Sequence, residues 1–175
     1  MMHPSTQRGF TLVETLVAIT IIALAMVGPL YAVQQSLTAA RNSRDYLIAS
    51  SLAQEGIEYV RSIRDANYLT VLGGGSRSWL YGLDGTGGST NCSSPCVVDP
   101  VRGTVSNTIQ PLRLNNQNLY TQQGGLPRVT PYTRTVQITA VPGSTTEVVV
   151  TVTVSWSAKG RPYTVTLIER LHNWL

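Results

Sequence analysis

Charged side chains and the residue types most used in catalysis are scarce in this chain. Only 13% of its 175 residues are Asp, Glu, Lys or Arg, a low share for a globular protein. There are two histidines and two cysteines. The basic residues are almost all arginine and are spread along the sequence without forming a cluster. Specific nucleic-acid binding needs a basic stripe or patch, so this distribution argues against a nucleic-acid partner.

Catalytic and metal-binding patterns are lacking as well. No Ser-His-Asp, Cys-His or paired-carboxylate arrangement stands out, because the few acidic residues and histidines are scattered. A zinc site needs about four ligands, more than this sequence brings together in one place. The glycine-rich stretch 82–88 lacks both the lysine of a phosphate loop and the acidic ligands of a calcium loop, so we expect a turn there. We therefore predict no enzyme activity, no metal and no cofactor.

What the sequence does have is one long apolar run. Residues 10–33 are mostly Leu, Ile, Val and Ala, and Glu14 is the only acidic or basic residue among them. A helix of this length can cross a hydrocarbon core of roughly 30 Å. Gly28 and Pro29 are expected to kink that helix, because proline removes one backbone hydrogen bond. A carboxylate at membrane depth costs about 2.5–3.5 kcal/mol, so Glu14 either has a function or reaches the headgroups from near the helix start.

The residues around Glu14 form a specific motif. Gly9 is followed by Phe10, then by Glu14 four residues later, and then by the rest of the unbroken apolar run. This pattern resembles the processing site of type IV prepilins and type II secretion pseudopilins. The resemblance implies that residues 1–9 are a leader peptide, that a prepilin peptidase cuts between Gly9 and Phe10, and that Phe10 is then N-methylated. It also implies assembly into a filament.

The chemistry of Phe10 and Glu14 agrees with this resemblance. Cleavage exposes an amino group at Phe10, and residues spaced by four lie on the same face of a helix. In an apolar filament core the amine of one subunit could neutralise Glu14 of another, whereas an unpaired charge there would be costly. We therefore predict that Phe10 and Glu14 act together in subunit assembly. The pair is interpreted as a device that fixes register, not as a source of net stability.

The same resemblance implies a set of partners and a location. The expected partners are a prepilin peptidase, other pilin or pseudopilin subunits, an inner-membrane assembly platform, and membrane lipid before assembly. The expected location is the inner membrane, crossed once, before assembly. After assembly the chain is expected in an extracellular or periplasmic filament.

Several alternatives stay open at this point. A secretory signal peptide could be cut after Ala25, although Glu14 would then lie in its apolar core and the apolar run would continue past the cut. An uncleaved signal anchor is another possibility, and either one would display a membrane-anchored or secreted binding module with a β head. Within the filament class, pilus subunits and type II secretion pseudopilins share the same N-terminal pattern. The function that we predict is a structural subunit of a pilus-like filament, of the minor kind.

The helix is expected to continue past the apolar run. Residues 34–69 form an amphipathic half in which apolar residues recur at intervals of three and four, and the helix should end near Asn67. Its charged residues are expected on a solvated face, with Arg61 and Asp65 as an i,i+4 pair. The segment 52–69 also resembles minor pilins and I/J/V-type pseudopilins.

The rest of the chain has two parts. Residues 70–131 are rich in Gly, Ser, Asn and Gln, which predicts a long loop region with one or two short strands. Cys92 and Cys96 lie there, and outside the cytoplasm we expect them to form a disulfide that stiffens the loop. Residues 132–175 alternate between apolar and polar, which predicts an antiparallel β-meander. The amphipathic helix from Leu37 to Ile63 can cover its apolar face, so the predicted fold is α+β and pilin-like.

The processing site gives the first prediction. Replacing Gly9 by a bulky residue should block cleavage and leave the precursor in the membrane, since the resemblance requires glycine before the cut. The intact mass of the unaltered protein should correspond to a chain that begins with N-methylated Phe10. A mass that begins at Met26 would instead establish a secretory signal peptide.

Overall fold

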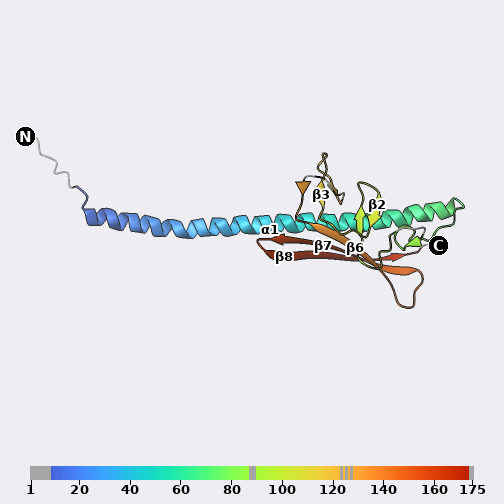
Figure 1. Ribbon diagram of the computed structural model, residues 1–175. Helices are drawn as coiled ribbons and strands as arrows, with labels where there is room; N and C mark the ends of the chain where they lie inside the picture. The colour runs from blue at the N-terminus through green and yellow to red at the C-terminus, as the bar shows by residue number, and fades with distance from the viewer. Residues whose placement is uncertain (1–8, 87–89, 123, 125, 127, 174–175) are drawn as a thin grey trace, which may run out of the picture. The chain divides into compact units, whose positions relative to one another are not determined.

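One helix, α1 (Leu12–Leu72), runs through both compact units of this protein. The structure is a computed structural model, and it describes residues 9–86, 90–122, 124, 126 and 128–173 (Figure 1). Unit 1 is Met1–Arg44 and unit 2 is Asp45–Leu175. Of the expected leader peptide, residues 1–8 lie outside the described residues.

α1 begins two residues later than predicted, because Thr11 caps it. The Thr11 hydroxyl oxygen accepts a hydrogen bond from the Glu14 backbone N–H at 3.3 Å, and the Thr11 carbonyl accepts one from the Thr15 N–H at 3.2 Å. A threonine followed three residues later by a glutamate is the spacing of a capping box. Phe10 therefore precedes the helix in this chain. The prediction placed Phe10 and Glu14 on one helix, and of the two only Glu14 lies within α1.

α1 also ends later than predicted, at Leu72 instead of near Asn67. Asn67 remains helical, and its buried side chain donates hydrogen bonds to two carbonyls of the segment that follows the helix. After the last turn, Gly74 has a φ of 87°, and its N–H donates to the Val71 carbonyl at 3.0 Å. A glycine in the left-handed region is a common end to a helix, because it has no Cβ to clash.

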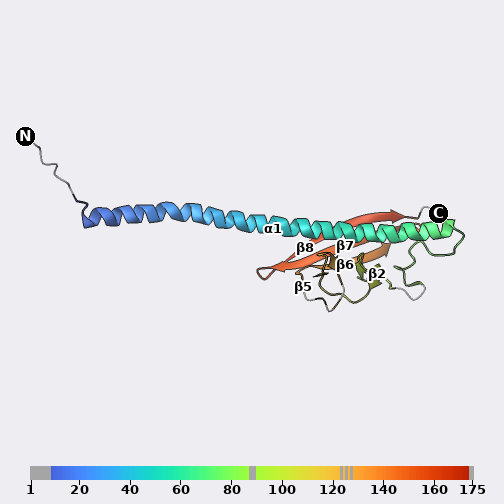
Figure 2. The same cartoon turned by 90° about the horizontal axis from the view of Figure 1, so that it is seen from above.

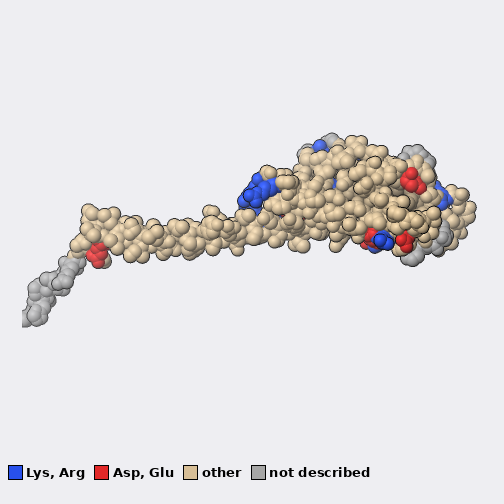
Figure 3. All heavy atoms as spheres, turned by 90° about the horizontal axis from the view of Figure 1, so that it is seen from below, with Lys and Arg blue, Asp and Glu red and all other residues tan. Residues whose placement is uncertain are grey.

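Over residues 12–33 the helix presents mostly apolar side chains on all sides. Residues 9–37 are all exposed, and they include most of the large exposed hydrophobic side chains of the described chain. Figure 3 shows this surface as nearly free of charge. α1 is long and apolar enough in its N-terminal part to cross a membrane. Pro29 lies inside α1, and the kink expected at Gly28 and Pro29 stays a prediction.

The C-terminal part of unit 2 is an antiparallel meander, as predicted. β6 (Thr133–Ala140), β7 (Glu147–Ala158) and β8 (Arg161–His172) lie side by side in that order. Every second residue of β7 from Val148 to Trp156 is buried, the pattern of a strand with one face on a core. In the β7–β8 turn, Lys159 and Gly160 have φ values of 51° and 74°. Two successive positive φ angles suit a tight hairpin, and β7 pairs with β8 along its full length.

The inner face of this sheet packs against the second half of α1 (Figure 2). One core cluster joins buried side chains of β6, β7 and β8 to helix residues Ala49, Leu52, Ala53, Ile57 and Val60. Sheet side chains approach the helix closely at Gly56, where an added Cβ would lie 3.0 Å from Val152 Cγ1 and 3.2 Å from Arg134 Cδ. The predicted α+β, pilin-like class, a long helix packed on a small antiparallel sheet, is confirmed.

The helix covers the sheet with a different stretch from the one predicted. The cover was expected from Leu37 to Ile63, but the buried residues of α1 run from Ala49 to Asn67. Leu47, which has the right spacing, is 70% exposed. The spacing of apolar residues did not show which turns of α1 pack on the sheet, because the same spacing continues through turns that do not contact it.

The charged side chains of the amphipathic half are paired differently from the prediction. Arg61 was expected to pair with Asp65, but it pairs with Glu58 at 2.6 Å and with Glu169 of β8. The hydrogen bond to Glu169 raises the pKa of Arg61. Asp65 instead pairs with Arg64 at 2.7 Å, and Arg64 is buried, not solvated as predicted. A helix-only rule could not predict the pair with Glu169, because the sheet brings this residue within reach from far along the chain.

The described residues between 70 and 131 contain more strand than predicted, five short strands instead of one or two. These are β1 (Val97–Asp99), β2 (Thr104–Ser106), β3 (Arg113–Leu114), β4 (Tyr120–Thr121) and β5 (Arg128–Val129). β1 pairs with β2, while β4, β3 and β5 form a second small sheet in that order. Strands of two or three residues are too short to show a period of two, so the sequence pattern could not indicate them.

Cys92 and Cys96 form a disulfide that closes one edge of the meander. Both residues are fully buried, and the N–H and carbonyl of Cys96 exchange 2.8 Å hydrogen bonds with Val136 of β6. The Ile138 N–H donates to the Cys92 carbonyl at 2.8 Å. An unpaired strand edge invites association with other chains, so this loop also protects β6. The disulfide thus belongs to the core and sheet edge, a larger role than the loop stiffening expected from sequence.

The close approach at Gly56 gives the second prediction. Gly56→Ala should lower the free energy of unfolding by about 1 kcal/mol, because overpacking of roughly 1–3 kcal/mol outweighs a helix-propensity gain of about 1 kcal/mol. Neither neighbour can move easily, since Val152 and Arg134 are fully buried. Chemical denaturation measures the change. Ser51→Ala, at an exposed position of the same helix, is the control and should be neutral or slightly stabilising. A stabilised Gly56→Ala would show that the core can relax there.

The disulfide gives the third prediction. Replacing Cys92 and Cys96 together by serine should lower the free energy of unfolding by at least about 2 kcal/mol, because the loop entropy contributes about that much and two buried hydroxyls add to the loss. Most of the far-UV circular dichroism of the sheet should remain, because β6, β7 and β8 pair without the loop. The freed β6 edge should also increase self-association, measured by light scattering. Free thiols in protein taken from outside the cell would contradict the oxidised pair.

Candidate assembly site

The proposed cleavage junction lies in the short segment before α1. Gly9 and Phe10 are both exposed, and the Phe10 side chain is 81% exposed. A side chain added at Gly9 would meet no atom within 4 Å. Within the described residues, the fold therefore does not require glycine at this position.

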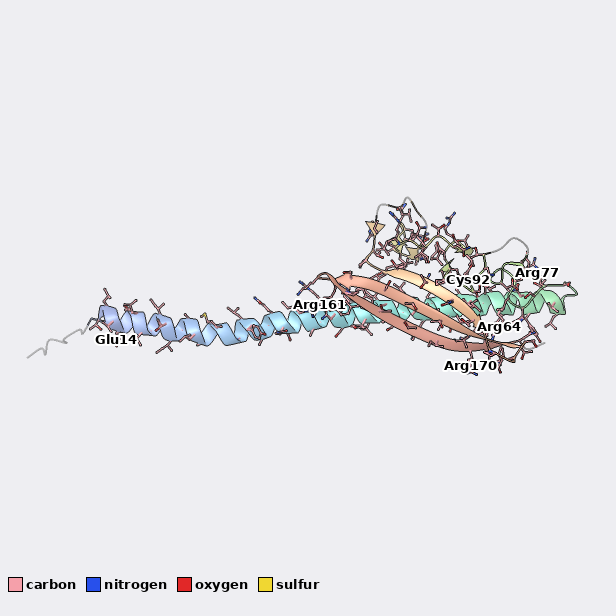
Figure 4. The ribbon with its side chains drawn as sticks, turned by 60° about the horizontal axis from the view of Figure 1, so that its bottom comes forward. Glu14, Arg64, Arg77, Cys92, Arg161 and Arg170 are labelled. Atoms are coloured by element: carbon pink, nitrogen blue, oxygen red, sulfur yellow. A yellow bond between two sulfur atoms is a disulfide. The ribbon has the colours of Figure 1, made fainter. Side chains whose placement is uncertain are left out.

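Glu14 lies in the first turn of α1, and Figure 4 shows it at the beginning of the helix. Its backbone N–H is bound by the Thr11 hydroxyl, so Thr11 fixes the place of Glu14 in the helix. The side chain is exposed, and within the described residues no cation forms an ion pair with it. The role of Thr11 as the N-terminal cap of α1 was not predicted, although the Thr-x-x-Glu spacing of residues 11–14 indicates it.

A shallow apolar hollow accompanies Pro29. Ile22, Ala25, Met26 and Leu30 line it together with Pro29, and its volume is about 360 Å³. Exposed apolar surface of this kind is unfavourable in water and marks a site of contact with lipid or another protein. In unit 1, therefore, an apolar surface surrounds the helix, and one carboxylate lies near its start.

A polar cluster that is buried in unit 2 was not predicted from the sequence. The fully buried guanidinium of Arg134 donates hydrogen bonds to the Leu52 carbonyl of α1 at 3.0 Å and to the Val98 carbonyl of β1 at 2.8 Å, and it pairs with Glu55. The Gln122 side chain in turn donates to the Arg134 carbonyl at 3.0 Å. These bonds tie the helix, the small strands and the meander together. Nothing in the sequence distinguishes Arg134 from the other scattered arginines.

A comparison with protein families identifies the N-terminal segment. Residues 4–28 match the prokaryotic N-terminal methylation motif, so the chain carries the prepilin motif of type IV pilins and pseudopilins. The match includes Gly9, Phe10 and Glu14 and ends at Gly28. No curated protein and no solved structure is significantly similar to this chain.

Proposed function

We propose that this protein is a structural subunit, of the minor kind, in a type IV pilus-like filament. The observation that supports this function is the methylation motif at residues 4–28, which leads directly into an exposed apolar helix. Proteins with this motif are pilin-type subunits, whose apolar helix serves first as an anchor and then as an assembly element. We propose no catalytic role for the chain.

The proposed sequence of events begins in the inner membrane. Residues 10–33 anchor the chain with a single crossing, and a prepilin peptidase cuts after Gly9. In lipid, the apolar side chains of α1 contact acyl chains, which removes the cost of exposing them to water. An assembly platform then transfers the subunit into a filament outside the membrane, where the helices of other pilin subunits replace the lipid.

Glu14 is proposed to set the position of each subunit in that filament. Cleavage would make Phe10 the N-terminus, directly ahead of the Thr11 cap, and N-methylation would keep its amine a cation. A neighbour displaced along the filament axis could pair its amine with this carboxylate. Wrong docking would leave two charges unpaired in an apolar layer, where the low dielectric makes them costly.

A type II secretion pseudopilin is the second candidate, because it shares the motif and because the segment 52–69 resembles both minor pilins and I/J/V-type pseudopilins. Purified surface filaments distinguish the two classes. We expect this chain in them in small amounts, with Phe10 as its N-terminus by mass spectrometry. Its presence only in periplasmic secretion assemblies would favour the pseudopilin. A membrane-anchored binding module would need neither Gly9 nor Glu14 and would occur in no filament.

The assembly role of Glu14 gives the fourth prediction. Glu14→Ala should accumulate in the membrane, because loss of a carboxylate eases insertion, but it should enter filaments poorly. Breaking a buried charge pair costs about 3–5 kcal/mol, enough to reduce incorporation by more than tenfold. Incorporation is measured as the ratio of filament-bound to membrane-bound protein at equal expression. If the chain initiates assembly, the number of filaments should fall as well.

Thr20→Ala is the matched control for this experiment. Thr20 is an exposed polar residue of the same helix segment, and its hydroxyl bonds only to the Val17 carbonyl of its own helix. Its replacement should leave incorporation unchanged. Normal incorporation of Glu14→Ala would show that the charge pair is dispensable and that the Glu14 side chain only reaches the headgroups from near the helix start.

A further inference from the structure

Unit 2 contains an open cavity, of about 400 Å³, formed around the last turns of α1. Small-molecule sites usually have volumes of about 300–1,000 Å³. The walls of this cavity come from α1, from the segment 77–82, and from β2 with the residues beside it. We call it the Arg77 pocket, and its lining includes Tyr59, Ile63, Asn67, Arg77, Tyr81 and Thr90.

Arg77 brings an unpaired positive charge to this pocket. Its Cζ atom lies 4.7 Å from the centroid of the Tyr81 ring, so the ring face holds the guanidinium while its N–H groups remain available to a ligand. Within the described part of the chain, no carboxylate forms an ion pair with Arg77. Figure 4 shows Arg77 in the segment that follows α1.

Asp84, the acidic residue closest to Arg77 in sequence, has other partners. Its carboxylate accepts hydrogen bonds from the Ser78 hydroxyl at 2.7 Å and from the Thr86 N–H at 3.0 Å. Burial alone would raise the pKa of Asp84, but the hydrogen bonds from Thr86 and Ser78 outweigh burial and lower it. Asp84 is therefore ionised and already satisfied, and the charge of Arg77 remains available for an external anion.

The helix side of the pocket is held in place. Asn67 is 4% exposed, and its Nδ2 donates to the Trp79 and Tyr81 carbonyls at 3.2 and 2.9 Å, which fixes the segment that carries Arg77. Tyr59 is half-buried beside it. Burial, and to a smaller extent the charge of Asp99, raises the pKa of Tyr59. Its hydroxyl therefore stays protonated and can donate a hydrogen bond.

These groups define the chemistry of a ligand. A guanidinium binds a carboxylate through two parallel hydrogen bonds. The Tyr81 ring and the aliphatic wall at Ile63 suit the C–H groups of a saturated ring, while the Tyr59 hydroxyl and the Thr90 side chain suit hydroxyl substituents. The volume of about 400 Å³ is enough for a single sugar ring.

We propose that the Arg77 pocket binds an acidic sugar, a uronic acid residue, with its carboxylate on Arg77 and its ring between Tyr81 and the α1 wall. This gives the head a recognition function that is separate from assembly. It does not depend on whether the filament is a pilus or a pseudopilus.

The test is a titration of the purified full chain, in detergent, with D-glucuronic acid, D-glucose and acetate, followed by saturation-transfer NMR. D-glucuronic acid should bind saturably at millimolar concentration. Both D-glucose, which lacks the carboxylate, and acetate, which lacks the sugar ring, should bind at least about tenfold more weakly. Arg77→Gln should weaken D-glucuronic acid binding at least about tenfold. Tyr59→Phe should weaken it severalfold. Arg77 is exposed, so its replacement leaves the fold unchanged, as circular dichroism can verify.

Arg161→Gln is the matched control. It removes the same charge from an exposed arginine at the other end of unit 2, as Figure 4 shows, and it should leave binding unchanged. Equal weakening by Arg161→Gln would show general attraction by net charge and would overturn the proposal. No saturable binding of D-glucuronic acid would overturn it as well. Equal binding of acetate would show an anion site without sugar recognition, and would refute the assigned ligand.

Discussion

The packing of α1 on the inner face of β6, β7 and β8 is the contact on which the rest of unit 2 depends. The helix residues are small where the sheet comes nearest. Gly56, which lies opposite Val152, has no side chain beyond a hydrogen atom. Arg134 is buried beside this contact and bonds to carbonyls of both α1 and β1. Because the guanidinium has no access to water, its hydrogen bonds specify where the small strands lie. Apolar burial holds helix and sheet together, and the buried arginine sets their arrangement.

One helix meets two different demands along its length. Up to Val33 the surface of α1 is mostly apolar on all sides, which suits lipid or other apolar helices. In unit 2 only one stripe is buried, and the remaining faces carry charges that pair with one another or with the sheet, as Arg61 does with Glu58 and Glu169. In the sequence this change is marked by the charged residues that appear after residue 40.

The sequence predicted the features that repeat and missed those that depend on single long-range contacts. The meander was predictable because β7 alternates over many residues, and the motif at Gly9, Phe10 and Glu14 was predictable because its spacing is local. The strands β1–β5 were missed because each is too short for a period. The burial of Arg64 and Arg134 was missed because it depends on neighbours far along the chain. The i,i+4 rule used for Arg61 considers only residues of the same helix and could not predict its pair with Glu169 of β8.

The position of the Thr11 cap has a consequence for maturation. Only Phe10 lies between the proposed cut and Thr11, and the hydrogen bonds that start α1 are accepted by the Thr11 hydroxyl and carbonyl oxygens. Removal of residues 1–9 therefore takes away none of the groups that begin the helix. The precursor and the mature chain can share one conformation from Leu12 onward, so maturation changes the charge and chemistry of the terminus without requiring the subunit to refold.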